Sequence, residues 1–349
     1  MLRVNVLGGS GYTGGEVLRI LATHPMVEVG IVTSSSNAGK PLHQLHPNLR
    51  GVLDLTFSPR ERLDHAEVLM VCVPHGRAME MMPQLLQNAD KVIDLSADHR
   101  LRDPADYPTW YGITHPHPEN LQRFVYGVPE LHREQLRSAT AASGPGCMAT
   151  AANLAMLPLF KAGLVEERHI IVDVKIGSSA AGVEVNISTH HPERANVVRA
   201  YAPTGHRHTA EVEQELAPYN GGRKPRIDLS AHAVDMVRGI LATCHLRPRG
   251  EVTDKDLWKA YRDAYGAEPF VRVVNQKAGL HQLPNPKVLL GSNFGDVGFQ
   301  LDPRGERIVA FGAIDNLVKG AAGSAVASMN LMCGLPERTG LEFPGLHPV

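Results

Sequence analysis

The chain has 349 residues, of which 43% are hydrophobic, 20% charged and 5% aromatic. This length is enough for two domains that each bury a core of their own. The 35 Lys and Arg residues nearly balance the 36 Asp and Glu residues, leaving a formal net charge of -1. That balance gives no electrostatic footprint for a nucleic acid partner, so we expect a globular protein that does not bind nucleic acid.

The four cysteines, at positions 72, 147, 244 and 333, are scattered without a C-x-x-C pair. This argues against a zinc ribbon and against a secreted disulfide framework. The N-terminus reads as a strand that runs into a glycine turn, not as a signal peptide. No apolar run approaches the roughly 20 residues of a membrane span. We therefore expect a cytoplasmic protein with no membrane contact.

The first half of the chain begins with an apolar strand at 2–7, a glycine turn at 8–15 and a helical stretch at 16–23. Further strands are predicted at 27–33, 67–74 and 91–95. Their apolar character is continuous and not alternating, which is typical of a parallel sheet covered on both faces. The prediction for this half is an α/β domain of the Rossmann type.

The pattern changes at the S-G-P-G break of residues 143–146, which precedes an Ala-rich helix at 148–161. Strands are then predicted at 170–176, 227–234, 240–246, 271–274, 297–301 and 308–314. This pattern predicts an α+β domain on an open mixed or antiparallel sheet. The expected domains are 1–143 and 144–315, with a helix at about 316–333 that completes the first domain and a tail at 334–349.

A dinucleotide site is predicted at the first glycine turn. Gly8, Gly11 and Gly14 stand between a strand and a helix, where glycines let the backbone approach a pyrophosphate at a helix N-terminus. A tight turn with no ligand is the alternative.

The second strand ends in Ser34, Ser35 and Ser36. It lacks the carboxylate that binds the ribose hydroxyl of NAD at this position. We therefore expect NADP(H), with these serines near the 2′-phosphate, although a plain polar loop has the same composition.

Cys147 is the candidate nucleophile. It follows Gly-Pro-Gly and opens a helix, a position that lowers a thiol pKa. The other three cysteines fit buried structural positions better. A buried, inert Cys147 remains the alternative.

The G-H-R-H-T-A-E segment at 205–211 concentrates two imidazoles, a guanidinium and a carboxylate at a helix start. His208 and Glu211 lie three apart on one helix face, so one histidine is expected as acid/base, oriented by Glu211, with Arg207 as an anion clamp. Two alternatives are a solvated helix start and a metal site built from His206, His208 and residues 190–191. Neither histidine pair has a recognisable zinc spacing, so we expect no metal.

Five motifs in order carry a family resemblance: GGSGYTGG at 8–15, DLSADHR at 94–100, PGC at 145–147, GHRH at 205–208 and DNLVKG at 315–320. With them, the chain resembles the N-acetyl-γ-glutamyl-phosphate reductases, relatives of aspartate-semialdehyde dehydrogenase, over nearly its whole length. The segments STHHPERA at 188–195, PTG at 203–205 and FPGLHP at 343–348 resemble the lysine-pathway branch. The SGPG at 143–146 departs from the Asn-Pro-Gly pattern of the arginine-pathway branch.

The resemblance implies an aspartate-semialdehyde dehydrogenase-like protein: a Rossmann NADP-binding domain and an α+β catalytic and oligomerisation domain, with NADPH as cofactor and a cysteine that forms a thioester. Carried over to this chain, Cys147 is the nucleophile, His208 the acid/base, and His206 and Glu211 its neighbours. Positions expected to contact the cofactor are Ser10, Gly11, Tyr12, Thr13, Ser34 to Ser36, Ser178, Ala180 and Asn316. For the substrate phosphate, the candidates are Arg100, Arg194 and Arg207.

The lysine-pathway branch implies an oxidoreductase that reduces L-2-aminoadipate 6-phosphate to the semialdehyde while the substrate is carried on a small acidic amino-group carrier protein, LysW. A homodimer or homotetramer is expected. Two alternatives stay open. One is the glutamyl phosphate reductase of arginine synthesis, acting on a free or carrier-bound substrate. The other is a non-catalytic NADP-binding redox sensor that uses Cys147.

Overall fold

The structure is a computed structural model that describes residues 1–349. Two compact units make up the chain. The first is Met1–Pro145 with Ala321–Phe343, and the second is Gly146–Gly320 with Pro344–Val349. The sequence-based boundary at 143/144 lies close to the first of these divisions. No helix is both long enough and apolar enough to cross a membrane.

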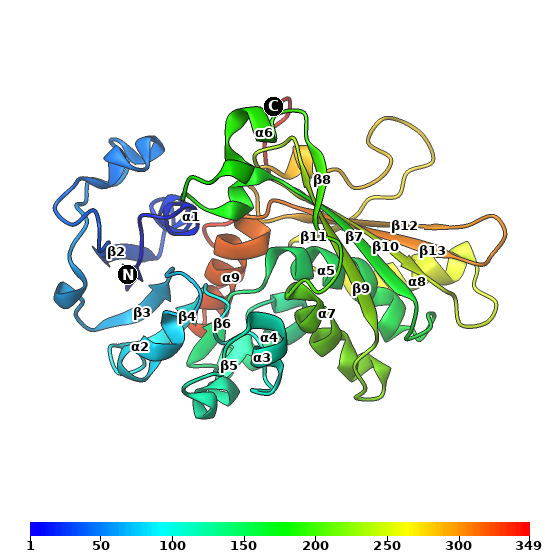
Figure 1. Ribbon diagram of the computed structural model, residues 1–349, viewed down its shortest axis with the longest axis horizontal. Helices are drawn as coiled ribbons and strands as arrows, with labels where there is room; N and C mark the ends of the chain where they lie inside the picture. The colour runs from blue at the N-terminus through cyan, green and yellow to red at the C-terminus, as the bar shows by residue number, and fades with distance from the viewer. The chain divides into compact units, whose positions relative to one another are not determined.

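The first unit is built on a parallel sheet of six strands in the order β2-β1-β3-β4-β6-β5 (Figure 1). The strands are β1 (Leu2–Leu7), β2 (Val27–Val32), β3 (Ala66–Val71), β4 (Ala89–Asp94), β5 (Phe124–Tyr126) and β6 (Ala141–Ser143). Every pairing is parallel, which confirms the predicted sheet. Continuous apolar strands such as β3 are buried along nearly their whole length, as expected for a sheet with helices on its faces.

The helices of the first unit are α1 (Tyr12–Leu21), α2 (Ala78–Leu85), α3 (Asp106–Tyr111), α4 (Pro129–Ser138) and α9 (Gly323–Met332). All ten residues of α9 are buried, because its small side chains permit close packing against α1, α4, β4 and β6. His24, after α1, bonds Asn330 of α9 through its Nε2 at 3.0 Å. The chain therefore returns after residue 320 to complete the first unit.

The second unit contains a mixed sheet of seven strands in the order β11-β12-β13-β10-β7-β9-β8. The strands are β7 (Ile170–Ile176), β8 (Val198–Ala202), β9 (Ile227–Val234), β10 (Ile240–Leu246), β11 (Val271–Val273), β12 (Gly295–Leu301) and β13 (Ile308–Ile314). The pairs β7/β9 and β11/β12 are parallel and the others antiparallel. This confirms the predicted α+β domain.

The sheet of the second unit packs against α5 (Cys147–Lys161), α7 (His208–Leu216) and α8 (Asp254–Tyr265) (Figure 1). A short helix, α6 (His191–Arg194), precedes β8. Every residue of α5 from Met148 to Phe160 is buried. A Cβ at Gly312 of β13 would lie 2.1 Å from the carbonyl oxygen of Ala151, so α5 rests directly on the sheet backbone. That contact fixes the start of α5 relative to the sheet.

The predicted helix at about 316–333 is interrupted at its start. Residues 318–322 form a π-helical turn, and α9 begins only at Gly323. The N–H of Gly320 donates to the carbonyl of Asp315, five residues back, which is the π pattern and often marks a functional site. The carboxylate of Asp315 accepts from the N–H groups of Leu317 and Val318, so it holds this turn in place.

Candidate functional site

The predicted nucleophile stands at the first residue of α5. Its N-cap, Gly146, has extended backbone (φ -71°, ψ 129°), and no side chain caps the helix. Cys147 is partly exposed, whereas the rest of the helix through Phe160 is buried. The first-turn N–H groups and the helix dipole therefore act at the cysteine.

Glu211 joins the start of α5 to α7. One of its carboxylate oxygens accepts a hydrogen bond from the Gly146 N–H at 2.7 Å, and the other lies 3.8 Å from Nε2 of His208. Glu211 is fully buried and His208 nearly so. A Cβ at Gly146 would lie 2.5 Å from Glu211 and 2.7 Å from His208, so only glycine fits before the cysteine. The predicted pairing of His208 and Glu211 is thus present, and it stands against the nucleophile helix.

The Gly146 N–H is occupied by this carboxylate. N–H groups in the first turn of α5 itself would therefore have to stabilise an oxyanion at the substrate carbonyl. One such hydrogen-bond donor contributes about 3–4 kcal/mol to transition-state stabilisation in measured enzymes.

His206 has a different environment from His208. Its Nδ1 accepts the backbone N–H of His208 at 3.2 Å, and the two rings meet edge to face with centroids 4.7 Å apart. Burial, with the nearby Arg207 charge, lowers the pKa of His206 to about 4. His206 is therefore neutral at pH 7 and serves as an acceptor at the start of α7, which leaves His208 as the better candidate for proton transfer.

Tyr201, in β8, was not identified from the sequence. Its ring contacts the ring of His206, with centroids 6.3 Å apart. Burial, with a smaller contribution from Cys147 and against the opposing charges of Arg207 and Arg194, raises the pKa of Tyr201 to about 12. The hydroxyl is therefore protonated and lies within electrostatic reach of the nucleophile. The one sequence signal for Tyr201 is an aromatic hydroxyl five positions before His206, and that signal is weak.

Arg194, at the end of α6, is half-buried and donates through Nη2 to the carbonyl of Ile176 at 3.0 Å. It has no carboxylate ion pair. Burial and the nearby Arg199 lower the pKa of Arg194. Arg199 in turn donates to the Ser188 carbonyl at 3.3 Å. Asp235 lies within electrostatic reach of Arg194 but forms no ion pair with it, so two guanidinium groups outside any carboxylate ion pair suit an anionic ligand.

The predicted dinucleotide turn lies in the first unit. Gly8 has φ +85°, and a Cβ there would lie 2.7 Å from the Cys72 carbonyl oxygen. A Cβ at Gly14 would lie 2.7 Å from Cα of Gly9. By contrast, a Cβ at Gly11, the N-cap of α1, would meet nothing within 4 Å. No side chain caps α1 and its first turn holds no acidic residue, so this N-terminus is open to an anion such as a dinucleotide pyrophosphate.

The serines after β2 face this turn. Ser34 is buried and donates to Oγ of Ser10 at 3.0 Å, whereas Ser35 and Ser36 are exposed. Tyr12, 46% exposed, and Thr13 stand at the beginning of α1. Ser34 and Ser10 thus come together within one unit, and contact of the three serines with an NADP ribose phosphate stays a prediction.

The remaining predicted cofactor residues lie in the second unit. Ser178 and Ala180 are in a 3-10 turn, and Asn316 follows β13. The amide of Asn316 accepts from the Gly239 N–H at 2.7 Å and donates to Oγ of Ser179 at 3.0 Å. Asn316 therefore joins three loops, and its role toward a cofactor stays a prediction.

Arg100, a predicted phosphate ligand, lies in the first unit and is largely buried. Its Nε donates to the Gly144 carbonyl at 2.8 Å, while the Gly144 N–H donates to the Asp94 carbonyl at 2.7 Å. The same motif buries an ion pair between Asp94 and His99, with Oδ2 and Nδ1 2.6 Å apart. The 94–100 motif thus fixes the loop that leads to the cysteine.

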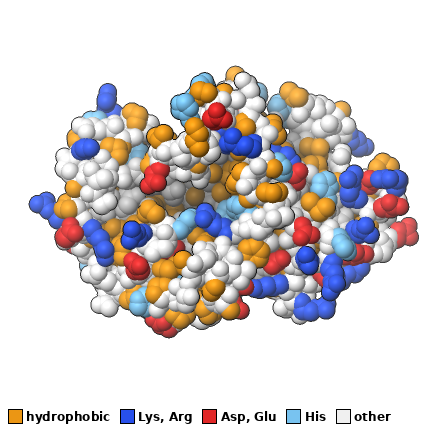
Figure 2. Space-filling model, in the orientation of Figure 1, with side chains coloured by type: hydrophobic (Ala, Val, Ile, Leu, Met, Phe, Trp, Pro, Cys, Tyr) orange, Lys and Arg blue, Asp and Glu red, His pale blue; other side chains and the backbone are white.

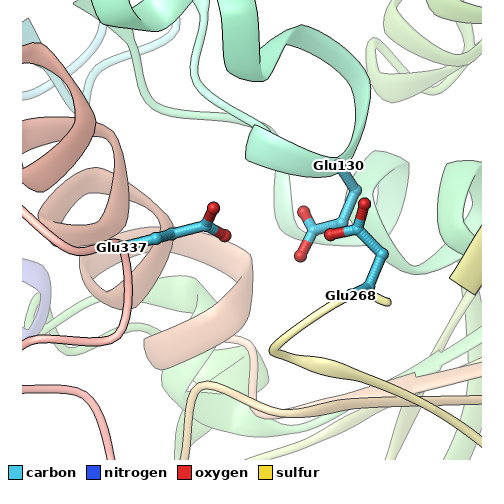
Figure 3. Close-up of side chains that lie close together, drawn as sticks. All are labelled: Glu130, Glu268 and Glu337. Carbon is cyan, nitrogen blue, oxygen red and sulfur yellow. The ribbon is translucent and has the colours of Figure 1, made fainter. Parts of the chain in front are cut away.

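Charged side chains also gather outside the site. The carboxylates drawn in Figure 3 are Glu130 and Glu337 of the first unit and Glu268 of the second. Glu337 pairs with Arg133 at 2.7 Å. On the visible face, basic and acidic side chains lie side by side at the β12–β13 hairpin (Figure 2), where Asp302 pairs with Arg304 and Arg307.

Comparisons with known proteins match both units. Residues 3–139 match the family model described as semialdehyde dehydrogenase, NAD binding domain. Residues 147–316 match the model described as semialdehyde dehydrogenase, dimerisation domain. Among solved structures, aspartate semialdehyde dehydrogenase II from Vibrio cholerae is similar with a TM-score of 0.71 and 16% identity, covering 96% of this chain and 98% of that one. The enzyme from Candida albicans, solved with NADP, has a TM-score of 0.68 and 14% identity, covering 95% and 98%.

Curated relatives are much closer in sequence. A protein of Thermomicrobium roseum named putative [LysW]-L-2-aminoadipate 6-phosphate reductase is 54% identical over 100% of both chains. A protein of Cenarchaeum symbiosum named putative [LysW]-L-2-aminoadipate/[LysW]-L-glutamate phosphate reductase is 53% identical, again over 100% of both. The [LysW]-L-2-aminoadipate 6-phosphate reductase of Deinococcus radiodurans is 47% identical over 99% of this chain and 98% of its own.

Proposed function

Because the chain belongs to the semialdehyde dehydrogenase family, we propose that it reduces an acyl phosphate to a semialdehyde through a thioester on Cys147. The substrate is L-2-aminoadipate 6-phosphate carried on LysW, as in the names of its relatives at 54% and 47% identity. The observation that carries the proposal is the start of α5, where Cys147 meets the buried pair of His208 and Glu211.

In the first step, the Cys147 thiolate attacks the acyl carbon. The bond from that carbon to the phosphate oxygen breaks, inorganic phosphate leaves and a thioester remains on Cys147. The uncapped first turn of α5 favours the thiolate and stabilises the oxyanion. Glu211 holds the helix start through Gly146, so the sulfur keeps its position as the carbonyl carbon becomes tetrahedral.

In the second step, the thioester carbonyl is reduced to a thiohemiacetal. NADPH supplies the hydride when it is bound, and the open glycine turn with Ser10, Ser34 and the following serines would hold it. The thiohemiacetal then collapses to the semialdehyde and returns the thiolate. His208, with Glu211 beside it, supplies the proton to the oxygen and takes it back on collapse.

The arginines are proposed to contact two different parts of this substrate, the phosphate at one end and the carrier protein at the other. Arg207, beside the histidines, and Arg100, on the 94–100 motif, are the proposed phosphate ligands. Arg194 and Arg199 form no ion pair with a carboxylate and lie at the exposed α6 and β8 segments, with Arg194 near Tyr201. An acidic carrier that delivers an extended, tethered substrate would contact these two arginines, which would steer the encounter.

A glutamyl phosphate carried on the same protein is the second candidate substrate. The relative at 53% identity is named for both the aminoadipate and the glutamate compound. The two substrates differ by one methylene, which a pocket distinguishes by only about 1–3 kcal/mol. Steady-state kcat/KM values for the carrier-bound aminoadipyl, carrier-bound glutamyl and free N-acetylglutamyl phosphates would rank them.

The assembly is proposed to be a homodimer or homotetramer, and the protein is proposed to act in the cytoplasm. The description of the matched family model, which names a dimerisation domain at residues 147–316, supports the first point.

Cys147→Ser tests the chemistry. We expect reductase activity to fall by at least about 10³-fold while NADPH affinity stays within a factor of about two, because the glycine turn belongs to the other unit. Wild-type protein incubated with the acyl phosphate and no NADPH should carry an acyl adduct on the Cys147 peptide in mass spectrometry. An adduct found only on Cys72, Cys244 or Cys333 would overturn the assignment.

Arg194→Glu and Arg199→Glu test the carrier. Each should raise KM for the carrier-bound substrate about tenfold at low salt, and the effect should shrink as ionic strength rises. Reduction of a small free acyl phosphate should stay nearly unchanged. Equal losses on both substrates would show that these arginines serve the chemistry or the fold.

A further inference from the structure

The connection between β2 and β3 packs against the predicted dinucleotide turn of the first unit. Its regular structure is confined to short 3-10 turns, such as Leu42–Gln44 and Pro47–Leu49. Three of its apolar side chains, those of Leu42, Leu49 and Phe57, are almost completely buried. These side chains anchor the connection to the core of the unit, so a polar side chain that lies between them has a fixed place.

His46 is the side chain of this connection that bonds the turn. It is buried, and its Nε2 lies 2.8 Å from the carbonyl oxygen of Gly9. A carbonyl oxygen can only accept, so Nε2 carries a proton and donates it. The ring meets that of Phe57 edge to face with centroids 6.3 Å apart, and a Cβ at Gly15 would lie 2.5 Å from two of its atoms. The imidazole is therefore held between Phe57 and the beginning of α1.

The two peptide groups that flank Gly9 are both held by bonds to this part of the chain. The Gly9 N–H donates to the Thr33 carbonyl at 2.9 Å, and the Gly9 carbonyl accepts from His46. The peptide bond that follows Gly9 is trans, so its N–H, which belongs to Ser10, points in the direction opposite to the carbonyl. The imidazole therefore sets the direction of the Ser10 N–H, one residue before the N-cap of α1.

We propose that His46 is a positioning residue for the cofactor, which holds the Gly9 carbonyl and thereby turns the Ser10 N–H toward the dinucleotide pyrophosphate. This inference rests on the cofactor site proposed above. Without the imidazole N–H, the Gly9 carbonyl would lose its donor, and the peptide would rotate to find another one. The N–H of Ser10 would rotate with it and leave the pyrophosphate.

A purely structural role would need only the ring of His46. The packing against Phe57 and Gly15 uses the flat shape of the imidazole, and an apolar ring of similar shape would supply it. The bond to Gly9 uses the N–H. Substitutions that keep either the ring or the donor therefore separate the two roles.

His46→Phe keeps a flat ring without the N–H, and His46→Gln keeps an N–H donor at a similar reach without the ring. In fluorescence titrations, we expect His46→Phe to raise the Kd for NADPH about tenfold and His46→Gln to stay within about threefold of the wild type. His43→Phe, on the same connection, is the matched control because it leaves the Gly9 bond in place, and it should bind NADPH as the wild type does.

A second ligand distinguishes positioning from a general loss of structure. The nucleotide 2′-AMP carries the ribose 2′-phosphate but has no pyrophosphate. In isothermal titration calorimetry, we expect its Kd to stay within a factor of about two among the wild type, His46→Phe and His46→Gln, because the Ser10 N–H does not serve it. Equal losses of NADPH and 2′-AMP binding in His46→Phe would overturn the proposal.

Gly15→Ala tests the same bond from the side of α1 and remains informative if His46→Phe does not fold. Alanine suits a helix, but its methyl must displace the imidazole, so the Kd for NADPH should rise about fivefold without a change for 2′-AMP. Unchanged NADPH affinity in this variant and in His46→Phe would overturn the proposal. A wild type that binds no NADPH would overturn the cofactor site as well, whereas the Cys147 adduct forms without cofactor and reports on the chemistry independently.

Discussion

Two histidines, the half-buried His206 and the buried His115, are held in the neutral form by their surroundings. His206 accepts an N–H at Nδ1 at the start of α7. His115, in the first unit, accepts the His117 N–H at Nδ1 and bonds the Asp98 carbonyl through Nε2. Both ring nitrogens of His115 are therefore used by a neutral tautomer, and a second proton would break the bond at Nδ1.

The first prediction follows from His115. Burial, together with His99, lowers its pKa to about 4 from 6.5. Between these values the unfolded chain binds more protons, so wild-type stability falls as pH decreases from about 6.5 toward 4, by up to about 3 kcal/mol from this residue. His115→Gln cannot titrate. Its destabilisation, about 1–3 kcal/mol at pH 7 from the lost hydrogen bonds, should therefore shrink at pH 5.

Urea unfolding at pH 7, 6 and 5 measures how the difference in unfolding free energy between the wild type and His115→Gln shrinks. His191→Gln, at an exposed position, is the control and should differ from the wild type by the same small amount at each pH. A His115→Gln penalty that stays constant with pH would show that His115 titrates normally in the folded protein.

At the residue scale, the sequence predicts contacts between residues that are close in sequence and misses contacts between residues that are far apart in sequence. His208 and Glu211 are three residues apart on a helix, so their proximity follows from helix geometry. The bond from Gly146 to Glu211 spans 65 positions, and the place of Tyr201 near Cys147 depends on how β8 pairs with β9. Neither relation leaves a periodic pattern in the sequence.

At the element scale, the π turn at 318–322 is explained by a close contact. A Cβ at Gly320 would lie 2.6 Å from Cβ of Cys147 and 3.1 Å from its Cα. The chain after β13 therefore needs a glycine at position 320, where it passes the start of α5. The carboxylate of Asp315, bonded to Arg238 at 3.0 Å and to the Gly291 N–H at 2.7 Å, anchors the turn from the other side.

Gly320→Ala is the second prediction. The added methyl must displace either the π turn or the first turn of α5, and both are backbone, so we expect a loss of about 1–3 kcal/mol of stability. Because the displaced residue is the nucleophile, kcat and the rate of Cys147 alkylation by iodoacetamide should fall. Their fall should exceed what the loss of folded protein alone would cause. Gly295→Ala is the control, since the nearest atoms there are side-chain tips of Leu154 and Ile314 at 3.2 and 3.4 Å. Equal effects of the two variants on alkylation would contradict the argument.

Strand length explains which elements the sequence predicts. The strands of six to eight residues, such as β1, β7 and β10, are long enough to show an apolar run and were predicted within three residues at each end. The three-residue strands β5 and β6 show no apolar run that stands out from its surroundings, whereas β11, equally short, is marked by the apolar residues of 271–274. The edge strand β8 is mostly exposed, so its sequence carries no buried face.

At the scale of the whole molecule, the first unit is discontinuous, and its last helix arrives after the entire second unit has been traversed. Because α9 is buried along its full length against α1 and α4, residues 1–145 alone lack part of their core. The two ends of the main segment of the second unit, Gly146–Gly320, lie close together, since Gly320 contacts Cys147. A short linker from Pro145 to Ala321 can therefore replace the second unit.

The third prediction compares two fragments. Residues 1–145 joined to 321–343 through a Gly/Ser linker of about eight residues should unfold cooperatively and bind NADPH, because that chain has both the glycine turn and α9. Residues 1–145 alone should lose the cooperative transition and near-ultraviolet circular dichroism, since the sheet surface beneath α9 is left uncovered. Thermal unfolding and NADPH fluorescence titration on both fragments are the measurements. Cooperative unfolding and cofactor binding by residues 1–145 alone would show that α9 is not needed for the first unit to fold.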